Sequence, residues 1–163
     1  MSEGPDQDAV SAEMAEAPAG VPLEVSDAAW LDEVKFDDRG LVVAVIQDAE
    51  GGDVLTVAYM NRTSLLKTLE TGRTWCWSRS RQELWCKGET SGDRQYVREV
   101  RMDCDGDALV VLVDQHGDGA CHTKNWSCFF RTIGRGPGVA RPGASRSPTS
   151  ARASGDMTAT GRV

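Results

Sequence analysis

The sequence predicts an α+β fold: a mainly antiparallel, curled β-sheet with one or two helices. Several short segments rich in β-branched and aromatic residues follow one another, with polar or glycine-containing segments between them. Only two segments show the spacing of apolar residues that is typical of a helix. The connections after Gly72 are too short to contain the crossover helices that parallel strands require, which favours antiparallel pairing.

A single domain over residues 21–133 is expected between two tails of opposite charge. Residues 1–20 are acidic and contain no basic residue, whereas residues 134–163 are dominated by Gly, Ala, Ser and Arg. Both tails contain too few large apolar side chains to offset the entropy lost on ordering, so we expect them to be disordered. The chain of 163 residues, 40% of them hydrophobic, leaves room for one compact core and not for two.

The first half of the domain is expected to form a short helix and a β-hairpin. Ser26 is a good N-cap, and the apolar residues that follow it form one stripe as far as Val34. Residues 41–46 and 54–60 are largely β-branched and apolar, and they flank a glycine pair at 51–52. A turn between two strand-like segments predicts a hairpin.

A second helix and three further strands are expected to follow. Asn61 can cap a helix that ends at Gly72, where a left-handed residue is favoured. The apolar face of this helix consists of Leu65, Leu66 and Leu69. The remaining strand-like segments are residues 74–78, 95–102 and 108–113.

The charge and the cysteine content exclude several classes of protein. The formal net charge is −7, and only the C-terminal tail has a basic excess, which argues against a broad nucleic-acid-binding surface. No apolar run is long enough to span a membrane, and the acidic N-terminus lacks the features of a secretory signal, so we expect a cytoplasmic protein without a membrane partner. In that reducing compartment the five cysteines are expected to be metal ligands, reactive thiols or buried apolar groups.

The run Asp-Cys-Asp-Gly-Asp at residues 103–107 is the first candidate metal site. In extended backbone its three carboxylates lie on one face and Cys104 lies on the other. Carboxylates suit a hard ion such as Mg²⁺, and a thiolate suits Zn²⁺. The alternative interpretation is a solvated turn that binds no metal. An EF-hand is excluded, because the sixth position of such a loop would be Ala108 instead of glycine.

A second group of potential ligands follows at Cys121, His122 and Cys128. Together with Cys104 they offer three thiolates and one imidazole, at spacings unlike those of a zinc finger. Three thiolates alone would leave a fourth zinc position for water, whose pKa the ion lowers toward neutrality for attack on an electrophilic carbon. A closed structural site that also uses His122 is equally compatible with the number of ligands.

Residues 77–92 form a candidate ligand surface. The segment alternates cations, hydroxyls, aromatic residues and glycines in a way that a buried core does not require. Arginine and serine side chains can bind phosphate, tryptophan faces can cover a base, and Gly88 and Gly92 allow backbone amides to approach an anion. Each cation taken alone could equally be ordinary surface charge.

Several ordered motifs lie between residues 40 and 130. They are Ala58-Tyr59-Met60-Asn61, Trp77-Ser78-Arg79-Ser80-Arg81, Lys87-Gly88-Glu89-Thr90-Ser91-Gly92, Asp103-Cys104-Asp105-Gly106-Asp107, Cys121-His122-Thr123 and Ser127-Cys128-Phe129. In this order they resemble the motifs of phosphoribosyl-AMP cyclohydrolase, an enzyme family of histidine biosynthesis. The chain departs from the family at Lys124, where glycine is common.

The resemblance implies a reaction, two metals and a partner chain. The implied reaction is hydrolytic opening of the N1–C6 bond in the adenine ring of 1-(5-phosphoribosyl)-AMP, which gives the formimino-AICAR ribotide in the third step of histidine biosynthesis. The implied cofactors are Mg²⁺ and one Zn²⁺ per subunit, in an intertwined homodimer whose zinc site is shared between the chains. The implied ligands are Cys104, Cys121 and Cys128 for zinc and Asp103, Asp105 and Asp107 for magnesium, with His122 as the proton-transfer residue.

The phosphorylated nucleotide substrate is expected to contact the candidate ligand surface. The residues expected to do so are Trp77, Ser78, Arg79, Ser80, Arg81, Lys87, Glu89, Thr90 and Ser91. Two other functions fit part of the pattern. A non-catalytic zinc protein that binds a nucleotide or RNA explains the thiols but not the carboxylates. A zinc-dependent nucleobase deaminase would require the His-x-Glu and Pro-Cys-x-x-Cys pattern, which is missing from the sequence.

Overall fold

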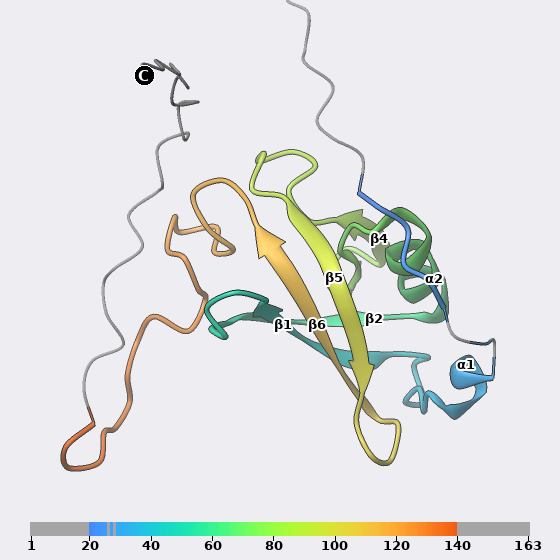
Figure 1. Ribbon diagram of the computed structural model, residues 1–163, viewed down its shortest axis with the longest axis horizontal. Coiled ribbons are helices and arrows are strands. Elements are labelled where there is room, and N and C mark those ends of the chain that lie inside the picture. The colour runs from blue at the N-terminus through green and yellow to red at the C-terminus, as the bar shows by residue number, and fades with distance from the viewer. Residues whose placement is uncertain (1–19, 26, 28, 140–163) are drawn as a thin grey trace, which may run out of the picture.

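A computed structural model of the chain describes residues 20–25, 27 and 29–139 (Figure 1). These residues form two helices and six strands. They are α1 (Trp30–Glu33), β1 (Val42–Asp48), β2 (Val54–Met60), α2 (Arg62–Thr71), β3 (Trp75–Ser78), β4 (Glu83–Cys86), β5 (Gln95–Met102) and β6 (Ala108–Gln115). Most of the two predicted tails lies outside the described residues, and the domain bounds 21–133 remain a prediction. No helix in the described ranges has both the length and the hydropathy needed to cross a bilayer.

Four strands form an open, curled sheet in the order β2-β1-β6-β5. The β1–β2 pair is an antiparallel hairpin and the β5–β6 pair is antiparallel, both as predicted, and the α+β class is confirmed. The central pair is parallel, with Val43 opposite Ala108. The argument from short connections missed this pair, because β1 and β6 are joined not by one short connection but by the whole chain that forms β2 to β5.

The core lies on one face of the two central strands. Along β1 and β6 every second side chain is buried, as a half-buried strand requires. The fully buried apolar side chains of these strands include Ala44, Ile46, Val111 and Val113. Burial of each large aliphatic side chain contributes roughly 1.5–3 kcal/mol relative to the exposed state, so this face dominates the stability of the sheet.

Helix α2 begins and ends as its sequence predicts. The Asn61 side chain accepts the Ser64 N–H at 2.8 Å, and the Ser64 hydroxyl accepts the Asn61 N–H at 2.9 Å, which forms a reciprocal cap. Gly72 ends the helix in the left-handed conformation (φ 62°) and donates its N–H to the Thr68 carbonyl. Leu65 is fully buried against the sheet, and Leu66 and Leu69 are half-buried on the same helix.

Helix α1 is shorter than predicted and starts later. Ser26, the expected N-cap, lies outside the described residues, and the helix begins at Trp30 after Ala29, which provides no side-chain cap. The helix ends before Val34, which is buried. Beyond it, Lys35 donates its N–H to the Gly106 carbonyl at 2.7 Å. The segment that follows this short helix is therefore hydrogen-bonded to the turn between β5 and β6.

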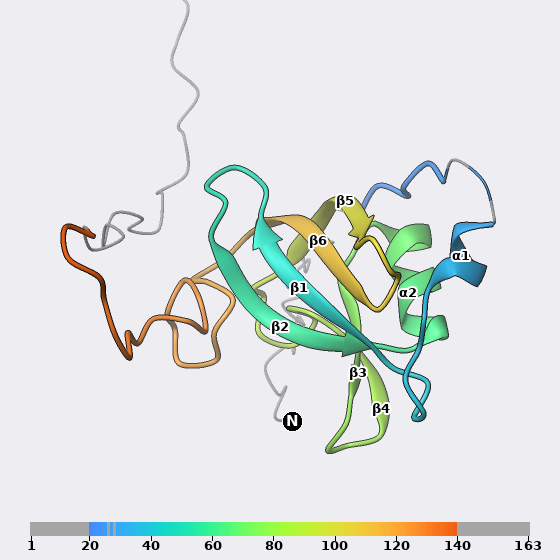
Figure 2. The same cartoon turned by 90° about the horizontal axis from the view of Figure 1, so that it is seen from below.

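Strands β3 and β4 form a separate two-stranded ribbon that projects from the sheet (Figure 2). Strand β4 was not predicted, because its four residues lie within the segment interpreted as a ligand surface. Trp85 of β4 packs against the core, so part of that segment is structural. Cys76 and Cys86 are both buried, and burial raises the pKa of the Cys76 thiol to about 12. These two thiols act as small apolar groups.

Candidate functional site

The three carboxylates of residues 103–107 converge in the turn between β5 and β6. One oxygen from each of Asp103, Asp105 and Asp107 lies within 4.8 Å of the others, and all three residues are exposed. The backbone is not extended here, so the alternation argument used on the sequence is wrong. The carboxylates meet because the chain reverses: the Asp103 carboxylate accepts the N–H groups of Gly106 at 2.9 Å and Ala108 at 3.2 Å.

Interactions within this carboxylate cluster change the pKa values of its members in opposite directions. The charge of Asp105 raises the pKa of Asp107, and the Asp103 carboxylate adds to this effect. Desolvation also raises the pKa of Asp103, but hydrogen bonds from Ala108 and from the neighbouring carboxyls outweigh it and bring that pKa below its usual value. A cation would relieve the repulsion, and three convergent oxygens are the ligands that Mg²⁺ prefers.

Two of the three candidate zinc ligands lie together at the opposite end of the sheet. The thiols of Cys121 and Cys128 interact directly with each other. A hydrogen bond with the Thr123 hydroxyl, 2.9 Å from Cys121 Sγ, lowers the pKa of Cys121, and the Cys128 thiol lowers it further. Cys128 is held in place by its N–H, which donates to the Leu55 carbonyl at 2.7 Å. A thiol with a lowered pKa is closer to the thiolate form that binds zinc.

The third candidate, Cys104, does not join this thiol pair within one chain. Cys104 is exposed in the turn before β6, whereas Cys121 follows the other end of that strand. Eight residues of strand span roughly 24 Å. Among the described residues, the carboxylate cluster is the one group of three side chains that could hold a metal ion. One chain therefore presents two thiols at one end of β6 and one thiol at the other.

His122 lies in a loop that closes on itself through backbone hydrogen bonds. Ala120 donates its N–H to the Trp126 carbonyl at 2.9 Å, and Cys121 donates its N–H to the Asn125 carbonyl at 3.2 Å. The His122 side chain is exposed at the tip of this loop. Lys124 adopts a left-handed conformation with φ 65°, which explains why glycine suits this position.

The first part of the predicted substrate surface lies at the tip of the β3–β4 ribbon. The guanidinium of Arg79 lies over the Tyr59 ring, 4.0 Å from its centroid. Arg81 reaches the Ser78 hydroxyl at 3.4 Å and pairs with Glu83 at 3.2 Å. Trp77 and Ser78 are half-buried, whereas residues 79–81 are exposed. Tyr59 belongs to one of the sequence motifs, but the sequence does not predict its contact with Arg79.

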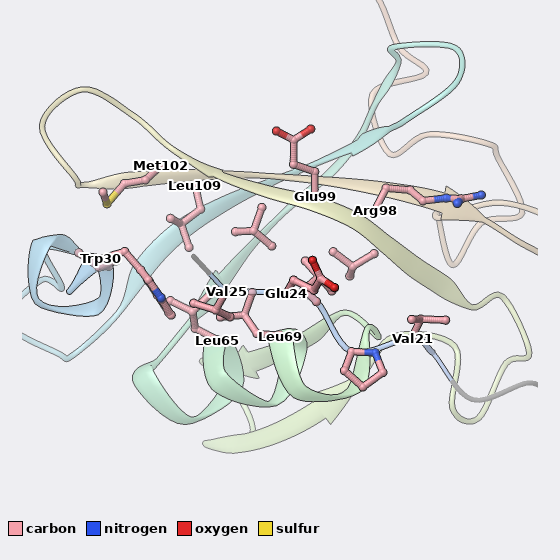
Figure 3. A pocket seen from close by; sticks show the side chains of 15 residues that line it. Val21, Glu24, Val25, Trp30, Leu65, Leu69, Arg98, Glu99, Met102 and Leu109 are labelled. Carbon is pink, nitrogen blue, oxygen red and sulfur yellow. The ribbon is translucent and has the colours of Figure 1, made fainter. Parts of the chain in front are cut away.

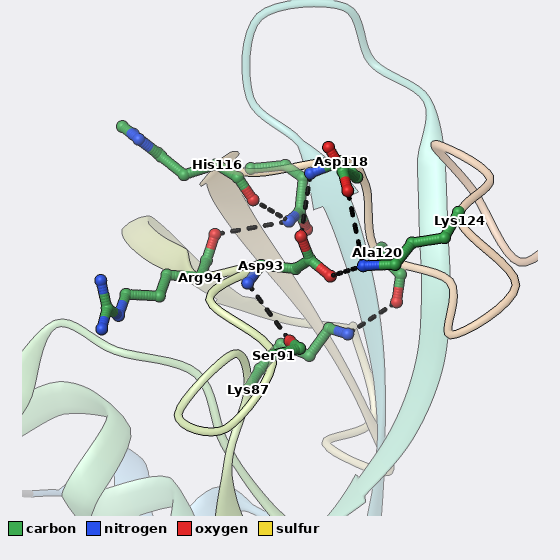
Figure 4. Close-up of polar contacts among 9 residues, drawn as sticks. Lys87, Ser91, Asp93, Arg94, His116, Asp118, Ala120 and Lys124 are labelled. Carbon is green, nitrogen blue, oxygen red and sulfur yellow. Dashed lines mark hydrogen bonds and ion pairs between the residues drawn. The ribbon is translucent and has the colours of Figure 1, made fainter. Parts of the chain in front are cut away.

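The second part of that surface lies in the β4–β5 loop, beside the loop of His122. Lys87 donates from Nζ to the Ala120 carbonyl at 2.7 Å (Figure 4). This predicted substrate-binding residue therefore also contacts the loop that contains Cys121 and His122. Glu89, Thr90 and Ser91 are exposed. The Ser91 hydroxyl accepts the N–H of Asp93 at 3.2 Å. The sequence reasoning did not select Asp93, although it directly follows the motif that ends at Gly92.

A cavity of about 730 Å³ lies elsewhere, between β5 and α2 (Figure 3). Its walls are mainly apolar and include Leu65, Leu69 and Val97. Residues 21–25 run along it, where the Leu23 N–H donates to the Leu69 carbonyl at 2.8 Å. None of the candidate metal, proton-transfer or substrate residues lines this cavity. The chemistry predicted from the sequence therefore belongs to exposed loops and not to this cavity.

Comparison with known proteins gives one consistent family. The profile described as phosphoribosyl-AMP cyclohydrolase matches residues 56–130. The phosphoribosyl-AMP cyclohydrolase of Chromobacterium violaceum is 58% identical over 109 residues, which cover 67% of this chain and 83% of that protein. The protein of the same name from Marinobacter nauticus is 46% identical over 127 residues, which cover 78% of this chain and 92% of the relative.

Longer relatives contain a similar sequence in part of their length. The histidine biosynthesis bifunctional protein HisIE of Thermosynechococcus vestitus is 59% identical over 114 residues, which cover 70% of this chain and 53% of that protein. The chain thus spans about half the length of the bifunctional relatives that it matches.

Proposed function

The chain belongs to the phosphoribosyl-AMP cyclohydrolase family, and on this premise we propose that it opens the adenine ring of 1-(5-phosphoribosyl)-AMP by hydrolysis of the N1–C6 bond. The product would be the formimino-AICAR ribotide, in the third step of histidine biosynthesis. A substituent on N1 makes the ring cationic and C6 electrophilic, so C6 is the atom that a water nucleophile would attack. A biosynthetic role of this kind also supports the proposal of a cytoplasmic location.

The thiol pair fits a zinc ion. Cys121 and Cys128 interact through their sulfur atoms, and the lowered pKa of Cys121 favours a thiolate. Bound zinc would lower the pKa of a water ligand toward neutrality and so supply the nucleophile. His122, which is exposed on the same loop as Cys121, is proposed to move a proton between that water and the substrate ring.

A third thiolate is proposed to come from Cys104 of a second chain. Two observations support this. Cys104 is exposed, and within one chain it lies at the far end of β6 from the thiol pair. A homodimer that brings the β5–β6 turn of one chain to the thiol pair of its partner would complete one zinc ion per subunit. It would also place the carboxylates of Asp103, Asp105 and Asp107 beside the zinc.

The carboxylate cluster fits Mg²⁺, which binds oxygen ligands and bridges readily to phosphates. The cations of the ligand surface are proposed to bind the two phosphate-bearing ends of the substrate. Arg79 and Arg81 extend from the tip of the β3–β4 ribbon, and Lys87 contacts the loop of Cys121 and His122. Most of the groups proposed for chemistry and binding are exposed in one chain, as expected for a site that closes only between two chains.

The observation that carries this proposal is the thiol pair Cys121–Cys128 in a chain that belongs to this family. The test is to incubate the purified protein with phosphoribosyl-AMP and to follow the ultraviolet change on ring opening, with and without a chelator. We expect turnover that the chelator abolishes and that added Zn²⁺ and Mg²⁺ restore. Zinc binding without turnover would contradict the proposal and favour the non-catalytic zinc protein that binds a nucleotide or RNA.

A further inference from the structure

One buried carboxylate, that of Asp93, joins the β4–β5 loop to the loop that follows β6 (Figure 4). Only 9% of its side chain is exposed. One oxygen accepts the Asp118 N–H at 2.9 Å, and the other lies 3.4 Å from Lys124 Nζ. Asp118 precedes Cys121 and His122 in the chain and Lys124 follows them. A single side chain therefore contacts both ends of the segment that carries these two residues.

Glycines on both loops make room for Asp93. Gly88 and Gly117 both have positive φ, at 79° and 86°. A β-carbon on Gly88 would overlap the backbone of Asp93, and a β-carbon on Gly117 would overlap its carboxylate. The close approach of the two loops at Asp93 thus depends on two positions where only glycine fits without strain.

Two further contacts hold the same loops together on either side of Asp93. Lys87 Nζ donates to the Ala120 carbonyl at 2.7 Å, and the His116 N–H donates to the Arg94 carbonyl at 2.8 Å. The contact at Asp93 is distinct from these two because it is the one made by a buried charge. An unpaired buried carboxylate is costly, so the loop after β6 is held in the position that pairs it.

Lys124 adds a charged contact to this arrangement. Its backbone adopts the left-handed conformation that favours glycine, with φ 65°. Its ammonium lies 3.4 Å from both the Asp93 and the Asp118 carboxylates. The ion pair with Asp93 thus occurs at a backbone position where glycine would adopt the same conformation without strain.

We propose that Asp93 is a positioning residue, which holds Cys121 and His122 in the geometry that the reaction requires. This inference rests on the proposed function, because it assumes that these two residues act on zinc and substrate. Asp93 is not among the residues proposed to bind metal or substrate. Its effect passes through the Asp118 amide and the Lys124 ammonium to the segment between them.

The test compares Asp93→Ala, Asp93→Asn and the control Asp37→Ala in the full-length protein. Asp37 is a matched carboxylate, since it accepts the N–H groups of Arg39 and Leu41 and pairs with the Arg39 side chain, but in a loop before β1. We expect Asp93→Ala to lower kcat by on the order of 10²-fold with little change in KM, as misplacement of catalytic groups by about 1 Å does. The control should keep the kcat of the wild type.

The asparagine variant separates the two halves of the contact. Asparagine keeps the acceptor for the Asp118 N–H and loses the charge opposite Lys124, so we expect it to recover most of the kcat lost with alanine. Combining Asp93→Asn with Lys124→Gly should recover the remainder, because glycine adopts the left-handed backbone without an ion pair. An asparagine variant as slow as the alanine variant would overturn the role given to the Asp118 contact.

A readout independent of turnover is hydrogen exchange at the amides of Ala120, Cys121 and Lys124, which close the loop. We expect faster exchange there in Asp93→Ala, with unchanged protection in β1 and β6, and no such change in Asp37→Ala. Unchanged exchange in the loop, or a lower melting temperature with unaltered kcat, would overturn the proposal. If the wild type has no cyclohydrolase activity, the proposed function fails on its own, and exchange still decides whether Asp93 holds the loop.

Discussion

If a second chain completes the zinc site, two inactive variants should restore activity to each other. One chain carries Cys104→Ala and keeps the pair Cys121–Cys128. The other carries Cys121→Ala and keeps Cys104. Within a single chain these positions lie at opposite ends of β6, an eight-residue strand that spans roughly 24 Å, so neither homodimer can build a complete site.

The size of the restored activity follows from the symmetry of the dimer. In the heterodimer, the Cys104→Ala chain contributes an intact thiol pair, and its partner contributes an intact Cys104, so one site is complete. The other site lacks two thiols. A heterodimer purified through two different affinity tags should therefore have about half of the wild-type kcat per dimer and bind about one zinc ion instead of two.

The assay is ultraviolet turnover of phosphoribosyl-AMP, together with zinc content by atomic absorption. In the matched control heterodimer, one chain carries Cys121→Ala and the other carries Cys128→Ala. Each change removes one thiol from the thiol pair of its own chain, so no complete site can form in that heterodimer. Equal inactivity of the test and control heterodimers would refute the shared site. Full activity of the Cys104→Ala homodimer would refute any role of that thiol in zinc binding.

Three further predictions concern local geometry. Gly106→Ala should lower the free energy of unfolding in urea by about 1–3 kcal/mol, because Gly106 has φ 81° and a β-carbon would overlap the Glu33 carbonyl. Gly40→Ala, also at positive φ but in open space, should cost less, and equal losses would contradict the role of the overlap. Tyr59→Leu should raise KM about two- to fivefold with kcat nearly unchanged, because it removes the ring beneath Arg79; an unchanged KM would separate Arg79 from substrate binding. Finally, desolvation raises the pKa of Asp93, but hydrogen bonds from Asp118 and Lys124 bring it below its usual value of 3.8. A lowered carboxyl pKa contributes stability that is present above the unfolded value and is lost as pH falls through the folded one. Urea midpoints measured between about pH 6 and pH 3 should thus fall less for Asp93→Asn than for the wild type, and parallel curves would contradict this.

Local features of the fold could be predicted because short-range chemistry determines them. Asn61 and Gly72 cap α2 through contacts within one helical turn, and the glycine pair at 51–52 lies in the turn between β1 and β2. Strand β4 was missed because its four residues lie within a segment rich in cations and glycines, and only pairing with β3 shows its structural role. The parallel pairing of β1 and β6 has no local signal, since the partners are far apart in the chain.

The candidate site was predictable in its residue types and not in its geometry. Alternating carboxylates at 103–107 suggested one extended face, but the hydrogen bonds of Asp103 fold the segment into a turn. Cys121 and Cys128 were selected from the sequence, and the structure brings their thiols together. Asp93 carries no signal of its own in a single sequence, because its importance comes from contacts across two loops that are distant in the chain.

The parallel pair at the centre of the sheet also sets the order in which the chain can fold. The β1–β2 and β5–β6 hairpins close short loops and can form early. The contact between β1 and β6 closes a much longer loop, because these two strands are far apart in the chain, and it therefore forms later. Neither hairpin alone buries its apolar face. On the ribosome, β1 would therefore present an unpaired edge until β6 emerges, and this interval is when the nascent chain is most open to pairing with the wrong strand.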